Sequence, residues 1–131
     1  MSHDPTAPNI LVVEDNPANL LLVRALLHRA GYRTSAAAAA EEVAAAIALE
    51  MPALILMDVH LPGKDGLTLT RELHADPATA HIPVVALTAN AMAGDSERCL
   101  AAGCVEYLTK PIQPRALTET LTRLIPIGVG V

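Results

Sequence analysis

Three short apolar runs, each followed at once by a polar residue, constrain the fold of this chain more than any other feature. They are Ile10–Val13, Ala53–Met57 and Pro83–Leu87, and Glu14, Asp58 and Thr88 follow them directly. Runs of this kind, rich in β-branched residues and without polar alternation, are typical of strands buried on both faces of a parallel sheet.

Stretches with helical signals separate these runs. Asn16 is a good N-cap residue, Pro17 suits the first helical position, and Gly31 suits the position just past a helix end. We expect helices over residues 17–30, 38–51 and 92–102, over 114–124, and from the loop 61–66 through residue 73. Two less apolar strands are expected over residues 32–36, nearer an edge, and 104–109, which ends at Lys110.

Alternation of five strands with five helices predicts an α/β fold, a doubly wound parallel sheet with right-handed crossovers. The 131 residues fit a single domain. We expect a loose N-terminal tail over residues 1–8, the folded domain over 9–124 and a C-terminal tail over 125–131. Sites in such sheets form at the carboxyl ends of the strands, which here bring together Glu14, Asp15, Asp58, Thr88 and Lys110.

Composition excludes several classes of function. Nine Lys and Arg against fourteen Asp and Glu, a net charge of −5, leave no excess to neutralise phosphates. Tyr32 and Tyr107 are the only aromatic residues, so stacking on bases has no platform. We therefore expect no direct nucleic-acid binding. No apolar run approaches the ~20 residues of a membrane span, and no signal peptide is recognisable. Cys99 and Cys104 fit a reduced, cytoplasmic compartment.

The carboxylates at the strand ends predict a cation. Glu14, Asp15 and Asp58 would repel one another, and hard oxygen ligands of this kind suit Mg²⁺. With Lys110 and Mg²⁺ the formal charges of the cluster cancel. If Asp58 accepted a phosphoryl group, the Thr88 hydroxyl, the Lys110 ammonium and backbone N–H groups could donate to it.

Four motifs in order carry a resemblance to a known family. They are VVEDN (12–16), MDVHLPGKDG (57–66), VVALTANAM (84–92) and YLTKP (107–111). With them the chain closely resembles the receiver domain of two-component response regulators over about residues 9–124. The resemblance implies a flavodoxin-like sheet of strand order 2-1-3-4-5. It also implies a cis peptide between Lys110 and Pro111.

The resemblance also implies a role for each site residue. Asp58 looks like the phospho-acceptor, which takes its phosphoryl group from a phosphohistidine of a histidine kinase or a histidine phosphotransfer protein. Glu14, Asp15, Asp58 and the backbone carbonyl of His60 look like Mg²⁺ ligands. Lys110 looks like the cation on the phosphoryl oxygens, and Thr88 with Tyr107 like the switch pair that presents a surface to a downstream protein partner.

Two alternatives stay open beside this phosphorelay function. One is a Mg²⁺-dependent phosphatase with an aspartyl nucleophile, which is disfavoured because such enzymes need a second aspartate where His60 stands. The other is a degenerate receiver that acts only as a docking module. On the favoured hypothesis the chain is not an enzyme, since it catalyses only its own phosphotransfer and dephosphorylation.

The first helix contains four consecutive apolar residues, Leu20–Val23, which cannot all face the sheet because they span about 300° of the helix. If Val23, Leu26 and Ala30 form the buried stripe, Leu21 lies almost opposite, on the face of Arg24 and His28. Leu20 lies at the margin of the stripe. Since both leucines are close to Asp15, we expect Leu20 and Leu21 to form a contact surface for the phosphotransfer partner.

Overall fold

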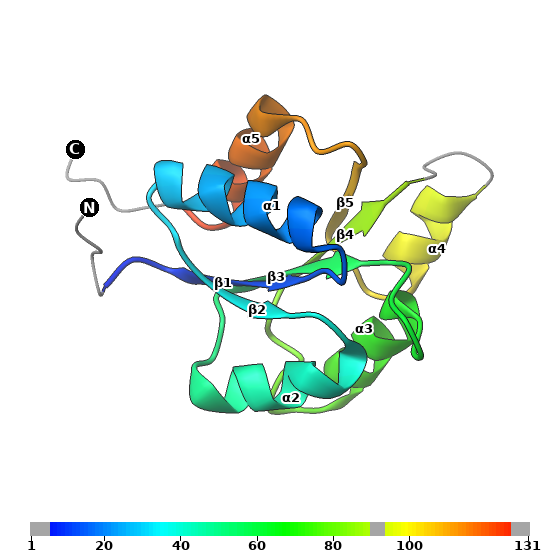
Figure 1. Cartoon of the computed structure of the whole chain (residues 1–131). Helices are drawn as coiled ribbons and strands as arrows, with labels where there is room; N and C mark the ends of the chain where they lie inside the picture. The colour runs from blue at the N-terminus through cyan, green and yellow to red at the C-terminus, as the bar shows by residue number, and fades with distance from the viewer. Residues whose placement is uncertain (1–5, 90–93, 127–131) are drawn as a thin grey trace.

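The computed structural model describes residues 6–89 and 94–126 (Figure 1). The expected start of the fourth helix at residue 92 therefore lies outside the described residues. Within them, strands and helices alternate in the order β1 (Asn9–Val13), α1 (Pro17–Arg29), β2 (Arg33–Ala37), α2 (Ala40–Leu49), β3 (Leu54–Asp58), α3 (Gly66–Ala75), β4 (Val84–Thr88), α4 (Asp95–Ala101), β5 (Glu106–Thr109) and α5 (Pro114–Leu124).

The strands form one parallel sheet in the order β2-β1-β3-β4-β5, which confirms the predicted doubly wound, flavodoxin-like topology of a single domain. β1, β3 and β4 are buried along their whole length, as their apolar runs predict. β2, which the sequence placed nearer an edge, is an edge strand and is mostly half-buried.

Helices cover both faces of the sheet (Figure 1). On one face, α1 and α5 bury Val23, Leu27, Leu117 and Leu121 against alternate residues of the strands. On the other face, α2, α3 and α4 enclose a second apolar cluster that includes Val43, Leu67 and Cys99. Because β3 lies at the centre of the sheet, its last residue, Asp58, is enclosed from both sides.

The first helix begins where its capping residue predicts. Asn16 Oδ1 accepts hydrogen bonds from the backbone N–H groups of Ala18 at 2.9 Å and Asn19 at 3.0 Å. At the other end Gly31 takes a left-handed φ of 101°, which only glycine adopts without strain. The side chains buried beneath α1 are those of Val23 and Leu27. The predicted buried stripe of Val23, Leu26 and Ala30 lay too far toward α5, because Leu26 and Ala30 are only half-buried.

Packing extends slightly beyond residues 9–124. Ala7 is buried, and its carbonyl oxygen accepts a hydrogen bond from Arg33 Nε at 2.8 Å. After α5, the carbonyl oxygen of Ile125 accepts a 2.7 Å hydrogen bond from the Tyr32 hydroxyl. Both ends of the described chain are therefore held by hydrogen bonds to Tyr32 and Arg33, at the start of β2. None of the described helices combines the length and the apolar character that crossing a membrane requires.

Candidate functional site

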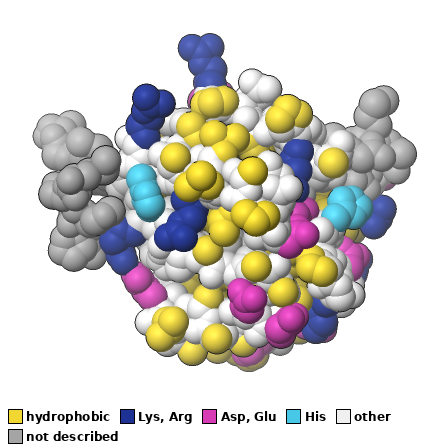
Figure 2. Space-filling model, viewed as in Figure 1, with side chains coloured by type: hydrophobic (Ala, Val, Ile, Leu, Met, Phe, Trp, Pro, Cys, Tyr) yellow, Lys and Arg dark blue, Asp and Glu magenta, His cyan; other side chains and the backbone are white. Residues whose placement is uncertain are grey.

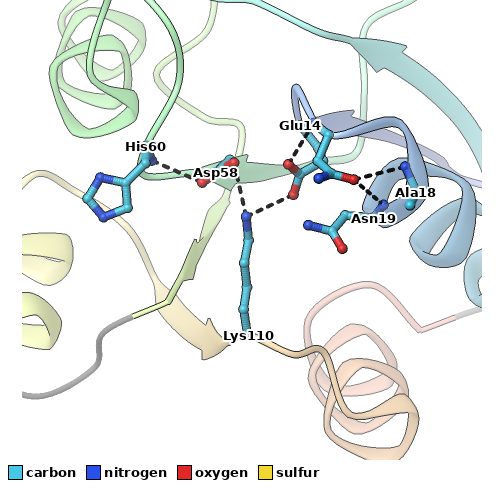
Figure 3. Close-up of polar contacts among 7 residues, drawn as sticks. Glu14, Ala18, Asn19, Asp58, His60 and Lys110 are labelled. Carbon is cyan, nitrogen blue, oxygen red and sulfur yellow. Dashed lines mark hydrogen bonds and ion pairs between the residues drawn. The ribbon is translucent and has the colours of Figure 1, made fainter.

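Three of the side chains singled out at the strand ends, those of Glu14, Asp58 and Lys110, meet at one edge of the sheet (Figure 3). Asp58 is the last residue of β3 and is 2% exposed, while Glu14, just after β1, is 1% exposed. Lys110, just after β5, extends between the two carboxylates. The parallel topology explains the convergence, since the carboxyl ends of all five strands lie at the same edge.

Asp58 is held by a donor on each oxygen. Its Oδ1 accepts a hydrogen bond from the backbone N–H of His60 at 2.9 Å. Its Oδ2 accepts one from Lys110 Nζ at 3.0 Å. The His60 residue itself is exposed, and in Figure 3 its imidazole points away from the Asp58 carboxylate. His60 thus meets Asp58 through its backbone, and its side chain is not part of the contact.

Glu14 shares the same lysine. Its Oε1 lies 3.0 Å from Lys110 Nζ, and its Oε2 accepts a 3.1 Å hydrogen bond from the backbone N–H of Asn16. Burial raises the pKa of the Glu14 carboxyl, and the negative charge of Asp58 adds to the rise, against the opposing effects of Asn16 and Lys110. Repulsion between carboxylates was expected to dominate, but burial is the larger cause.

Lys110 remains the cation of the site. Burial alone would lower the pKa of its ammonium, but the hydrogen bonds and charges of Glu14 and Asp58 outweigh that effect and raise it. The side chain is only 21% exposed, so these contacts are weakly screened by water. The backbone N–H of Lys110 also donates to the carbonyl oxygen of Thr88 at 2.8 Å, which fixes where the lysine leaves β5.

The acidic cluster has the donor set of a hard-cation site. Glu14, Asp15 and Asp58 each offer a carboxylate oxygen, and these oxygens all lie within 4.8 Å of one another. Asp15 is exposed, whereas Glu14 and Asp58 are buried. Glu14 Oε1 is buried and, within the described residues, its close polar contact is the ion pair with Lys110 rather than a hydrogen bond. Carboxylates with such spare capacity suit Mg²⁺.

The two residues expected to form the switch lie on neighbouring strands. Thr88 ends β4 and is fully buried, and Tyr107 in β5 pairs with Ala86 of β4. Tyr107 is half-buried against the α2–α4 side of the core. It also lines a cavity of about 360 Å³ together with residues of β5 and the first part of α5. Their roles as a switch remain predictions.

The leucines expected to contact a partner differ in exposure. Leu21 is 72% exposed, whereas Leu20 packs against the core beneath α1. Leu21 lies on the same helix face as Arg24 and His28, as expected, and the two longer side chains extend from that face to Thr34 Oγ1 of β2, at 2.9 and 2.8 Å. Sequence reasoning missed Leu22, which is 47% exposed on the side toward α5. The helical repeat could have indicated this exposure, because Leu22 lies at least 100° around the helix from the buried residues Val23 and Leu27.

Sequence reasoning also missed the role of Gly66, which starts α3. Its backbone N–H donates to Val59 at 3.0 Å, and a Cβ at this position would overlap the carbonyl oxygen of Asp58. The glycine thus lets the loop close directly over the end of β3. The Asp65-Gly66 pair, a common turn signal, was visible in the sequence.

The topology and the acidic edge define a flavodoxin-like α/β domain with a candidate cation site. The model of the response regulator receiver domain family matches residues 10–122. The chain therefore belongs to this family and is a receiver domain of two-component signalling.

Two relatives show the settings in which such domains occur. The polar-differentiation response regulator DivK of Brucella ovis is 41% identical over 113 residues, which cover 86% of this chain and 92% of DivK. The sensor protein GacS of Pseudomonas syringae is 42% identical over 120 residues, which cover 89% of this chain but only 13% of GacS. The similarity thus extends to a short response regulator and to one part of a large sensor protein.

Two solved structures are similar in fold and sequence. The receiver domain of the sensor histidine kinase PA1611 of Pseudomonas aeruginosa, which has a magnesium ion in its active-site cleft, superposes with a TM-score of 0.83 at 40% identity, covering 92% of this chain and 98% of that chain. The second is the Saccharomyces cerevisiae co-crystal structure of the histidine phosphotransfer protein Ypd1 with the receiver domain of its response regulator Ssk1. Its TM-score is 0.80 at 27% identity, covering 90% of this chain and 88% of that chain.

Proposed function

We propose that this receiver domain accepts a phosphoryl group on Asp58 from the phosphohistidine of a histidine kinase or a histidine phosphotransfer protein. One observation carries the proposal: Asp58 is a nearly buried carboxylate with Lys110 Nζ on Oδ2 and the His60 N–H on Oδ1, beside two further acids. A carboxylate placed between a cation and an N–H donor is ready to take on a more highly charged group.

In the transfer step, an Asp58 carboxylate oxygen attacks phosphorus while the bond from phosphorus to the histidine nitrogen breaks. The leaving imidazole keeps the electron pair of that bond, and solvent supplies any proton it takes up. Lys110 then pairs with a phosphoryl oxygen, and the Thr88 hydroxyl and Tyr107 rearrange toward the new group. This rearrangement changes the surface around Tyr107, which a downstream protein partner would read.

We further propose that Glu14, Asp15, Asp58 and the backbone carbonyl of His60 hold Mg²⁺. Bound there, the ion would offset the negative charge that accumulates as the phosphoryl group arrives. The magnesium ion in the PA1611 receiver cleft supports this assignment, as does the clustering of the three carboxylates in this chain.

The acceptor assignment is tested by chemical labelling. Incubation with acetyl phosphate and Mg²⁺ should add one acid-stable, base-labile phosphoryl group, detected by intact-protein mass spectrometry, and Asp58→Asn should abolish it. Asp76→Asn is the matched control, because Asp76 is an exposed aspartate outside the cluster and an asparagine oxygen can accept the same hydrogen bond from the N–H of Ala78.

Labelling of Asp58→Asn at the wild-type level would show that the acceptor is another residue. Absence of labelling in the wild type would favour the alternative that the chain acts only as a docking module.

A further inference from the structure

A groove runs between α1 and α5, the two helices that cover one face of the sheet. Leu26, Arg29 and Ala30 line it from α1, and Pro114, Arg115 and Glu119 are among the residues that line it from α5. Its volume is about 540 Å³. That is enough for a few side chains of a partner, the size expected of a pocket that takes the apolar anchors of a docked helix.

The groove is separate from the phosphorylation site. On α1 the first residue that lines the groove is Leu26, ten residues after the capping Asn16. At a rise of ~1.5 Å per residue, Leu26 lies roughly 15 Å along the helix from its N-terminal end, which is next to the acidic edge.

The charge around the groove is opposite in sign to that of the chain. Two arginines and one glutamate line the groove, Arg29 from α1 with Arg115 and Glu119 from α5, although the net charge of the chain is −5. In Figure 2, Lys and Arg side chains surround the hydrophobic side chains over α1 and α5, whereas most acidic side chains lie over the lower half of the molecule. The local field therefore favours an acidic partner.

The one acidic side chain at the groove does little to neutralise it. Glu119 Oε2 lies 4.0 Å from Arg115 Nε, and the two side chains are 71% and 90% exposed. An exposed pair at this distance is weak, so Arg115 is available to an incoming carboxylate. Arg29, on the opposite side of the groove, is exposed as well. A ligand in the groove would thus meet an arginine on each side.

The groove itself is apolar enough to anchor a helix. Leu26 and Ala30 are half-buried and, with Pro114, present hydrocarbon to the groove. Leu22, 47% exposed and one turn before Leu26, extends this apolar surface along α1. Half-buried apolar side chains flanked by arginines match a partner helix with an apolar stripe bordered by carboxylates.

We propose that the groove between α1 and α5 is a docking site for an acidic amphipathic helix of a partner protein. The apolar stripe of that helix packs on Leu26, Ala30 and Pro114, and its carboxylates pair with Arg29 and Arg115. This surface goes beyond the phosphotransfer contact proposed at Leu21 and beyond the region around Tyr107.

The test uses a designed helical peptide with leucines on one face and glutamates on the others, titrated into the isotope-labelled full chain and followed by NMR. The control peptide has lysine in place of each glutamate. The changes in chemical shift caused by the glutamate peptide should map to residues 22–30 and 114–119. The double variant Arg29→Glu/Arg115→Glu should weaken binding at least about tenfold, as loss of two charge contacts implies. Arg71→Glu, which changes an exposed arginine on α3, should bind like the wild type.

Three results would overturn the proposal. They are equal binding of the lysine peptide, equal weakening by Arg71→Glu, and no binding of the glutamate peptide at millimolar concentration. Sedimentation of the free chain adds a fourth: a dimer that Arg29→Glu/Arg115→Glu dissociates and the peptide does not would assign the groove to a second copy of the chain.

Discussion

At the scale of single residues, Lys110 determines the charge balance of the site. Its Nζ lies 3.0 Å from one oxygen of Glu14 and 3.0 Å from one oxygen of Asp58, although the two acids come from different strands. Both carboxylates are nearly inaccessible to water. One ammonium therefore faces two buried carboxylates, and burial raises the pKa of Glu14 in spite of the ion pair with Lys110.

The raised pKa of Glu14 predicts a pH dependence of stability. The unfolded state releases this proton near pH 4.5 and the folded state only at higher pH, so the associated stability is present below the unfolded pKa and is lost as pH rises through the folded one. Glu14→Gln mimics the protonated form. Without metal, the free energy of unfolding of Glu14→Gln minus that of the wild type should increase as pH rises from 4 to 7. The increase should be about 1.4 kcal/mol for each unit by which folding raises the pKa of Glu14.

Urea denaturation at a series of pH values measures this difference. Glu41→Gln is the control, because Glu41 is exposed in the first turn of α2 and lies outside the acidic cluster. A difference between Glu14→Gln and the wild type that stays constant with pH would contradict the argument.

At the scale of elements, α1 has three distinct sides. Val23 and Leu27 face the sheet, Arg24 and His28 reach Thr34 of β2, and Leu26 and Ala30 face α5. Leu21 is left on the outside, 72% exposed, in the second turn after the acidic edge. An exposed leucine is ordinary by itself. Its position in the second turn of α1, close in the chain to Asp15, makes it a candidate contact for the phosphotransfer partner.

Leu21→Glu should therefore slow phosphotransfer from a histidine phosphotransfer protein, by roughly tenfold for a leucine at the centre of an interface, and leave labelling by acetyl phosphate nearly unchanged. Rapid-quench phosphotransfer with radiolabelled donor measures both rates. Leu49→Glu is the control, because Leu49 is 88% exposed at the end of α2, on the other face of the sheet.

Equal slowing with both donors would show that Leu21→Glu damages the site itself. Unchanged rates with both donors would remove Leu21 from the partner surface.

The bounds of elements were predictable where the chain carries specific signals. Asn16 and Pro17 start α1, Gly31 follows its end, and α5 spans Pro114–Leu124 as predicted. The second helix was predicted over residues 38–51 and is observed over Ala40–Leu49. Its alanines carry no cap signal: Ala39 makes no side-chain cap, and the N–H of Ala38 is satisfied instead by Glu42 Oε1.

At the scale of the whole molecule, the fold gathers acids from separate strands at one edge, and Mg²⁺ bound only to the folded protein should stabilise it. A tenfold excess over the dissociation constant adds about 1.4 kcal/mol, or roughly 5 °C in Tm for a domain of this size. Calorimetry at neutral pH with millimolar Mg²⁺ measures the shift. Asp58→Asn should raise the metal-free Tm and shrink the Mg²⁺ response.

Potassium chloride at equal ionic strength is the control for the calorimetry. A Tm that responds equally to both salts would argue against a specific cation site.

The convergence of Glu14, Asp58 and Lys110 followed from the sequence, because apolar runs indicate buried parallel strands and their polar ends share an edge. The strand order followed from the resemblance to receiver domains. The contacts at that edge did not follow. The His60 N–H on Asp58 depends on the path of the loop after β3, and the closure of Gly66 on Asp58 depends on atomic spacing. The Asp65-Gly66 pair indicates a turn, but residue types alone predict neither contact.

The bridge from Lys110 to Asp58 spans 52 residues of chain. Glu14, Asp15 and Asp58 are synthesised before Lys110, the cation that pairs with Glu14 and Asp58. Lys110 directly follows β5, the last strand to be synthesised. A ribosome-bound chain that has completed β3 therefore carries an unbalanced acidic edge until β5 has docked beside β4. The strand that completes the sheet is thus also the one that brings a cation, Lys110, beside Asp58.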